Sequence, residues 1–174
     1  IDQLQPDVVI ACDDSASKYL IVKHIKGTDI PTIFCGVNWT VKAYGYPYPN
    51  VTGMIEVAPI KPLINEAHNL LPKAKSIAFI SADVPTQEKD AQRIKSIAKT
   101  EGLNFNVKLV NDFEQWKKAF NEVQKADIVV LGNPAGIYNW DQQLAETYIR
   151  QQTRSLTVSF GVTMSRHSIF AMIN

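Results

Sequence analysis

The order of apolar segments along this 174-residue chain predicts an α/β fold in which parallel sheets are flanked by helices. Short, continuous apolar runs alternate with longer stretches in which apolar residues recur at helical spacing. Residues 8–11 and 32–35 are two such runs, of the kind found in parallel strands buried on both faces. A helix is predicted between them, from Ser15 to Lys26. A strand–helix–strand unit of this kind implies a parallel pair joined by a right-handed crossover.

The same alternation continues after residue 55. Helices are predicted at residues 60–71, 91–102, 113–123 and 140–151. Strands are predicted at residues 76–80, 105–110, 127–131 and 156–160, with a shorter apolar run at 169–173. Asp112, followed three residues later by Gln115, matches a helix-capping pattern, so a helix should begin directly after Asp112. The apolar side of that helix is Phe113, Trp116, Phe120 and Val123.

Residues 36–55 form a connection that is too long and too aromatic for an ordinary loop. It is interpreted either as a hinge between two lobes or as a binding loop. Its central tyrosine and proline run, residues 44–49, is typical of a structural crossover, whereas Asn38 and Trp39 follow a strand directly and are binding candidates. We therefore expect residues 1–54 to form a partial N-terminal lobe with a crossover segment, and residues 55–174 a C-terminal lobe that is incomplete at its end.

Composition and charge argue against several classes of protein. A net charge of +1 predicts no attraction to nucleic acid or to membranes, and no stretch approaches the about 20 apolar residues that span a bilayer. His24, His68 and His167 are isolated, so we expect neither a metal nor another cofactor. Cys12 and Cys35 end two predicted strands and are expected to be buried free thiols, with a disulfide between them as the less favoured alternative.

The sequence contains no recognisable catalytic motif. There is no G-x-S-x-G elbow, no P-loop and no complete G-x-G-x-x-G. Asp13-Asp14 is similar to the acidic pair of response-regulator receiver domains, but Leu131-Gly132-Asn133 lacks the phospho-accepting aspartate which that chemistry needs. Neither cysteine has a histidine in a segment that would bring it close. We therefore expect a protein that is not an enzyme.

The loops that follow the predicted strands carry the candidate ligand-binding residues, because ligands of α/β proteins bind at the carboxyl ends of parallel strands. Carboxylates suit a ligand ammonium group, helix N-termini suit a carboxylate, and aromatic rings suit an apolar body. This mixture predicts a small zwitterion or a polar aromatic ligand. The candidates are Asp13, Asp14, Ser15, Asn38, Trp39, Asp83, Pro85, Thr86, Pro134, Ala135, Tyr138 and Gly161.

Each main candidate also has a structural alternative. Asp14 or Ser15 would equally serve to cap the helix that follows. Trp39 would equally pack within a hinge, and Tyr138 would equally cover the edge of a sheet. The residue types and their positions do not decide between these roles.

Three segments carry a resemblance to a known family: Pro6-Asp7-Val8-Val9-Ile10-Ala11, Ile30-Pro31-Thr32-Ile33-Phe34-Cys35-Gly36-Val37 and Asn50-Val51-Thr52-Gly53-Met54. Together they resemble the ABC-transporter substrate-binding family of the type I periplasmic-binding fold, in which a P-D-x-x-x strand, an I-P-x-V-F strand and an N-x-T-G crossing recur in this order. Ser81–Thr86 resembles the loop that opens the first helix of the second lobe, and Asn133–Ala135 its counterpart two strands later.

The resemblance implies two Rossmann-like lobes that close, like a Venus flytrap, on a small solute in the cleft between them. Amino acids, including aromatic ones, are the ligands it implies. It also implies a periplasmic or extracellular location, with a membrane anchor in the full-length protein as an option, and an ABC-transporter permease or a sensor signalling domain as the partner. One departure is Val37-Asn38-Trp39, where the family often has a G-D-P-like loop.

The resemblance further implies that the chain is truncated at both ends, because each lobe lacks some of the family's strand–helix units. Incomplete lobes leave sheet edges unpaired, and such edges favour a homodimer. Two other functions stay open at this point. One is a ligand-sensing effector domain of a lac-repressor-type transcription regulator, and the other is an α/β enzyme whose catalytic residues lie outside this fragment.

Overall fold

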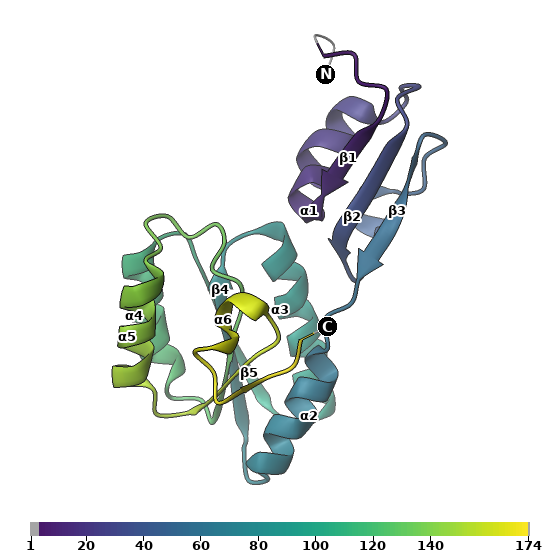
Figure 1. Cartoon of the computed structure of the whole chain (residues 1–174). Coiled ribbons are helices and arrows are strands. Elements are labelled where there is room, and N and C mark those ends of the chain that lie inside the picture. The colour runs from purple at the N-terminus through teal and green to yellow at the C-terminus, as the bar shows by residue number, and fades with distance from the viewer. Residues whose placement is uncertain (1–3, 174) are drawn as a thin grey trace. The chain divides into compact units, whose positions relative to one another are not determined.

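The computed structural model describes residues 4–173, which divide into two compact units (Figure 1). The first unit ends at Ala58 and the second begins at Pro59. The division predicted after residue 54 falls inside a strand of the first unit, Val51–Glu56. Each unit has its own parallel sheet and its own core.

The first unit contains a three-stranded parallel sheet with strand order β1-β2-β3. Its elements are β1 (Val9–Cys12), α1 (Asp13–Ala16), the π-helix η1 (Ser17–Ile25), β2 (Thr32–Asn38), the short 3₁₀ helix η2 (Lys42–Tyr44) and β3 (Val51–Glu56). The predicted strand–helix–strand unit is present. The helix begins two residues earlier than predicted and takes the wider π form from Ser17.

Strand β3 was missed, because Asn50–Met54 was interpreted as part of a crossing rather than as a strand. Gly53 interrupts the apolar run there, yet only glycine fits at this position. A Cβ atom on Gly53 would lie 2.0 Å from the carbonyl oxygen of Phe34 on β2. The side-chain amide of Asn50 donates to the carbonyl oxygens of Ile25 and Ile30, at 3.2 and 3.0 Å. The Gly53 contact and the Asn50 hydrogen bonds therefore hold β3 in place beside β2.

Within residues 4–58, one face of this sheet is covered and the other is open. Ala11, Phe34 and Val51 are buried against Ile21 and Ile25 of η1. The alternate residues face the other way, and Ile10, Ile33 and Met54 are 68%, 45% and 74% exposed. The prediction that residues 8–11 and 32–35 form strands buried on both faces is therefore wrong for this structure. Cys12 is on the open face and is also exposed, so the expected burial of that thiol is wrong as well.

The second unit contains a five-stranded, all-parallel sheet with strand order β5-β4-β6-β7-β8. Its strands are β4 (Ser76–Ala82), β5 (Asn104–Val110), β6 (Ile128–Leu131), β7 (Leu156–Ser159) and β8 (Phe170–Ala171). Its helices are α2 (Ile60–Leu70), α3 (Pro85–Thr100), α4 (Phe113–Val123), α5 (Gln142–Gln152) and α6 (Val162–Ser165). All the helices and strands predicted after residue 55 are present.

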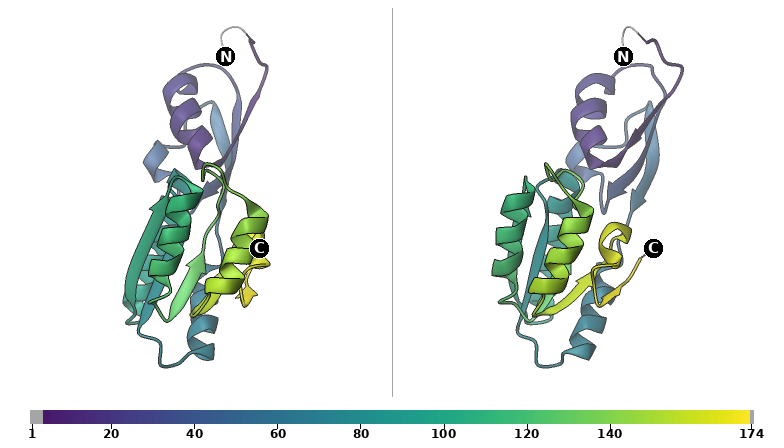
Figure 2. Two further views of the ribbon diagram at one scale, coloured as in Figure 1. Left: turned by 90° about the vertical axis from the view of Figure 1, so that its left-hand side faces the viewer. Right: turned by 60° about the vertical axis from the view of Figure 1, so that its left-hand side comes forward.

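Helices cover both faces of this sheet. Helices α4 and α5 lie on one side, and α2 and α3 on the other (Figure 2). Strands β4 and β6 are consequently buried along nearly their whole length, and Ile77, Phe79 and Ile80 are at most 1% exposed. The apolar stripe predicted for residues 113–123 is buried throughout. Trp116 meets Trp140 edge to face, with 5.0 Å between the ring centroids and 88° between the ring planes.

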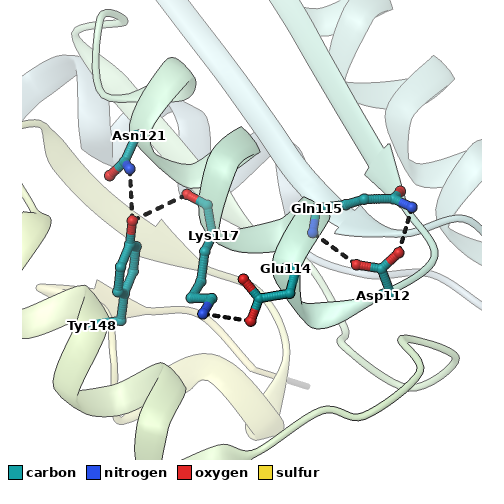
Figure 3. A network of polar contacts seen from close by, with 6 residues as sticks. All are labelled: Asp112, Glu114, Gln115, Lys117, Asn121 and Tyr148. Atoms are coloured by element: carbon teal, nitrogen blue, oxygen red, sulfur yellow. Dashed lines mark hydrogen bonds and ion pairs between the residues drawn. The ribbon is translucent and has the colours of Figure 1, made fainter.

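The predicted cap of α4 is confirmed. The carboxylate of Asp112 accepts a hydrogen bond from the backbone N–H of Gln115 at 2.8 Å and another from its side-chain amide (Figure 3). Along the same helix, Lys117 forms an ion pair with Glu114 at 2.6 Å. Asn121 donates to the hydroxyl of Tyr148 at 2.6 Å, which ties α4 to α5. None of the helices within residues 4–173 is long and apolar enough to cross a membrane.

Candidate functional site

In the first unit, two strand-end loops come together around one buried carboxylate. Asp14, just after β1, is fully buried. One oxygen of its carboxylate accepts hydrogen bonds from the backbone N–H and the side-chain amide of Asn38, at 3.1 and 3.2 Å. The other oxygen accepts from the hydroxyl of Tyr44 at 2.6 Å. Burial and the nearby Asp14 carboxylate raise the pKa of Tyr44. Asp14 therefore joins the end of β1 to the end of β2 and to the segment that follows.

The residues beside this buried group have an unusual backbone. Asp13 and Trp39 have φ values of 76° and 62°, in the left-handed region that residues other than glycine rarely adopt. Such conformations cost free energy, persist only where the surrounding structure imposes them, and cluster at functional sites. Asp13 is exposed and Trp39 is half-buried. The backbone N–H of Trp39 donates to the carbonyl oxygen of Glu56 on β3 at 2.9 Å.

The backbone conformation at the end of β2 also favours a glycine. Gly36 has a φ of 66°, and a Cβ atom placed on it would lie 3.4 Å from the backbone nitrogen of Asp13. Ser15 follows in the first turn of α1 and is half-buried. Of the predicted site residues in this unit, Asp13, Asp14, Asn38 and Trp39 are thus gathered at the carboxyl ends of β1 and β2. Tyr44 was assigned to the crossover, and only its contact with Asp14 places it here.

In the second unit, a buried polar network joins the ends of β4 and β6. Gln87, in the first turn of α3, accepts hydrogen bonds from the hydroxyl of Ser81 and from the backbone N–H of Asn133, the latter at 3.0 Å. The Gln87 amide donates to Asp90 at 3.1 Å. Gly132 lies against this network, because a Cβ atom there would come within 2.4 Å of the Ser81 hydroxyl oxygen. Ser81, Gln87 and Asp90 were not among the predicted site residues, and the contact of Gln87 with Asn133, 46 residues away, is visible only in the fold.

Five of the predicted residues of this unit lie within two positions of Ser81, Gln87 or Asn133 in the chain. Pro85 begins α3, and Thr86 follows it in the first turn; both are half-buried. Asp83 is exposed at the end of β4, with the side-chain amide of Asn111 at 3.4 Å from its carboxylate. Pro134 is buried and Ala135 is exposed. The backbone N–H of Ala135 donates to the side-chain oxygen of Asn133 at 3.0 Å.

Tyr138 and Gly161 lie in two further strand-end segments. The main chain of Tyr138 pairs with the segment after β5. Its backbone N–H donates to the carbonyl oxygen of Asn111 at 2.7 Å, and its carbonyl oxygen accepts from the backbone N–H of Phe113 at 3.1 Å. Its side chain is 72% exposed. Gly161 precedes α6, and its backbone N–H donates to the hydroxyl oxygen of Ser159 at 3.1 Å. All the predicted residues of this unit therefore lie in segments that follow the carboxyl ends of its strands, with Asp83, Asn111 and Tyr138 in one neighbourhood.

A separate hollow of the first unit lies away from these residues. It has a volume of about 790 Å³ and includes Pro31, Thr32 and Asn50 at the amino ends of β2 and β3. None of the predicted site residues lines it. The residues with strained backbones and buried polar partners lie at the opposite ends of the strands. We place the candidate site of the first unit at those carboxyl ends.

Comparisons with known proteins add information at the level of the fold. No protein-family model and no curated protein sequence matches the chain. A solved structure of an ABC domain in complex with L-Trp, from Streptococcus pneumonia, matches 99% of the chain with a TM-score of 0.78 and 16% identity. A conserved domain protein from Vibrio cholerae O1 biovar eltor matches 95% with a TM-score of 0.70 and 18% identity. An extracellular ligand-binding receptor from Rhodopseudomonas palustris HaA2 matches 90% with a TM-score of 0.53 and 11% identity.

These likenesses confirm the predicted fold class, which is α/β with parallel sheets flanked by helices. The chain spans 60%, 57% and 43% of the lengths of the three matched chains. The first matched protein was solved with L-Trp, and the third is described as an extracellular ligand-binding receptor. The identities are low, so the likeness is one of fold.

Proposed function

We propose that this chain belongs to an extracytoplasmic solute-binding protein that binds an amino acid, with aromatic amino acids as the first candidates. The observation that carries the proposal is the likeness in fold, over 99% of the chain, to a protein solved with L-Trp. The polar and aromatic residues at the strand ends support it, because they match the groups of an amino acid. The function is binding without catalysis and without a cofactor.

In the first unit, Asp13 is proposed to hold the ammonium group of the ligand and Trp39 to pack on its apolar body. Asp13 is exposed, and Trp39 is the one aromatic residue among the predicted site residues of this unit. Asp14 has both carboxylate oxygens engaged by Asn38 and Tyr44, so its proposed role is to hold the two loops in place. Asn38 and Ser15 complete this part of the proposed site.

In the second unit, the N-terminus of α3 is proposed to hold the ligand carboxylate. This helix has 16 residues, and its N-cap residue, Val84, has no side-chain oxygen that could accept hydrogen bonds from the first turn. Backbone N–H groups and the helix dipole favour an anion at such an end. Thr86 and Pro85 border this end, Asp83 precedes it, and the exposed ring of Tyr138 offers a second aromatic surface. Pro134, Ala135 and Gly161 are proposed to shape the surrounding backbone.

The wider setting is also a proposal. We place the protein in the periplasm or outside the cell, where an ABC-transporter permease or a sensor signalling domain would read the ligand-bound state. Two copies would pair through edge strands of their parallel sheets. The edge strands are β1 and β3 in the first unit and β5 and β8 in the second. Light scattering of the chain in solution tests this pairing, and a monomer at all concentrations would remove it from the proposal.

Isothermal titration calorimetry of the chain against the L-amino acids, with L-Trp, L-Phe and L-Tyr first, tests the function. We expect saturable binding of at least one aromatic amino acid. The Trp39→Ala and Tyr138→Ala variants should each weaken that binding by roughly 10-fold, as expected for loss of an aromatic contact. Tyr19→Ala is a matched control, because Tyr19 is a 49% exposed aromatic residue on η1 outside the proposed site. A well-folded chain that binds none of the amino acids would overturn the proposal.

A further inference from the structure

The two cysteines of the chain lie side by side on the open face of the first sheet. Cys12 is the last residue of β1, and Cys35 is its register partner on β2. Their Sγ atoms are 3.1 Å apart, and both thiols are free. Cys12 is exposed and Cys35 is half-buried, so a small reagent can reach the pair from solvent.

The backbone geometry permits a bond between them. Neighbouring strands lie about 4.8 Å apart, and disulfides join Cα atoms that are about 4.4 to 6.8 Å apart. The sulfur atoms would have to move closer by about 1 Å to reach the disulfide bond length. Rotation about the two Cα–Cβ bonds would bring the sulfur atoms together. There is room for this rotation, because no helix within the described residues covers this face of the sheet.

We propose that Cys12 and Cys35 form a reversible intramolecular disulfide when the protein meets a small-molecule or protein disulfide as oxidant. The Cys12 thiolate attacks the oxidant RSSR, which gives a mixed disulfide and releases one thiol, RSH, after protonation. Cys35 then loses its proton to solvent, and its thiolate attacks the Cys12 sulfur and releases the second RSH. Two protein thiols are oxidised and one RSSR is reduced to two RSH.

The position of this pair gives the disulfide a structural consequence. Asp13 follows Cys12 directly, and Gly36 follows Cys35. These two residues are in contact, because a Cβ atom on Gly36 would lie 3.4 Å from the backbone nitrogen of Asp13. A covalent bond one residue before each of them would fix the spacing of the loops that carry Asp13 and Asn38. The inference goes beyond the proposed function and does not depend on it.

Paired thiols in proteins can also bind a metal ion. Structural zinc sites have four ligands, usually cysteine and histidine. The described residues contain no group of three or more His, Cys, Asp or Glu side chains able to hold a metal ion. The pair therefore fits a redox role better than a metal site.

The test is to equilibrate the whole chain with oxidised glutathione and to measure its mass and its free thiols. We expect a loss of two hydrogens, about 2 Da, with no retained glutathione and with Cys12 and Cys35 found in one cross-linked peptide pair. Dithiothreitol should reverse the change. The hydrogen bond with Cys12 raises the pKa of Cys35, so ring closure should become faster as the pH rises from 7 towards 9.

The cross-link should also stabilise the first unit, because it closes the chain between residues 12 and 35. We expect the oxidised chain to melt about 5 °C or more above the reduced chain. The C12S and C35S variants each keep one thiol and should retain glutathione as a mixed disulfide. The double variant should show no redox-dependent change in melting temperature. Stable glutathione adducts on the wild-type chain, disulfide-linked dimers, or two unreacted thiols would each overturn the proposal.

Discussion

The two sheets of this protein are buried to different degrees. In the second unit, helices lie on both faces of the sheet, and strands β4 and β6 are buried almost completely. In the first unit, η1 covers one face and leaves Ile10, Ile33 and Met54 exposed on the other. The apolar runs in the sequence are alike, so the runs alone do not reveal how many faces are covered. The same residue type should therefore contribute very differently to stability in the two sheets.

An isoleucine-to-alanine pair tests this difference most directly. Ile80→Ala in β4 removes a side chain that is 1% exposed, and should lower the free energy of unfolding of the second unit by about 2 to 5 kcal/mol. Ile10→Ala in β1 removes one that is 68% exposed, and should change stability by less than about 0.5 kcal/mol. Urea denaturation measures both. Similar losses at the two positions would mean that the open face is covered in solution.

The packed side of the first sheet should still be sensitive to change. Gly53→Ala would place a Cβ atom 2.0 Å from the carbonyl oxygen of Phe34, so strands β2 and β3 would have to move apart. We expect a loss of about 1 to 3 kcal/mol, as for other overpacked sites. Gly161→Ala is the matched control, because its new Cβ atom would meet nothing closer than 3.8 Å. Equal stability of the two variants by urea denaturation would contradict the packing described for β3.

Helix capping provides a third contrast between the units. Asp112 caps α4 through the backbone N–H of Gln115, whereas the N-cap position of α1 is Cys12, which makes no side-chain capping bond. Asp112→Ala should cost about 1 kcal/mol of stability in the second unit, and Asp112→Asn should cost less because asparagine also caps helices. Thermal melting followed by circular dichroism compares the two variants. A loss for asparagine as large as for alanine would argue against a capping role.

The smallest effect concerns pH. The backbone N–H of Lys75 and the hydroxyl of Ser76 donate to the carboxylate of Asp127 and lower its pKa. The folded pKa is thus below the unfolded value of about 4. The resulting stability is complete above that value and is lost as the pH falls through the folded pKa.

In Asp127→Asn, the loss of stability on going from about pH 5 to lower pH should be shallower than in the wild-type chain. The difference should be under about 1 kcal/mol, because Asp127 is only half-buried and solvent screens its carboxylate. Urea denaturation at several pH values measures it. Asp7→Asn, at an exposed position, is the control. A wild-type chain and an Asp127→Asn variant with parallel pH profiles would show that this carboxylate contributes nothing.

The sequence predicts elements best where their signals are local. The helix over residues 113–123 follows from a capping pair and an apolar stripe within one segment, and both are observed. Strand β3 was missed because Gly53 breaks the apolar run, and the need for glycine arises only when Phe34 lies alongside. The π form of η1 was not expected either, since apolar spacing does not separate it from an α-helix over so short a stretch.

In the candidate site, too, features with local signals could be predicted and features that depend on distant residues could not. Strand-end positions could be found from the order of elements, and the predicted residues do lie in strand-end segments. The role of Asp14 could not be found in this way, because it depends on Asn38 and Tyr44, which are 24 and 30 residues away in the chain. Gln87 was missed for the same reason, since its partner Asn133 is 46 residues away.

The placement of the tryptophans has a consequence for optical spectroscopy. The chain has three: Trp39 is in the first unit, and Trp116 and Trp140 meet edge to face in the second. A chain with Trp39→Phe would show tryptophan fluorescence from the second unit alone, and a chain with only Trp39 would show it from the first. The two rings held at 88° should also give a near-ultraviolet dichroism signal that vanishes when the second unit unfolds. Each unit thus carries its own tryptophan probe of unfolding.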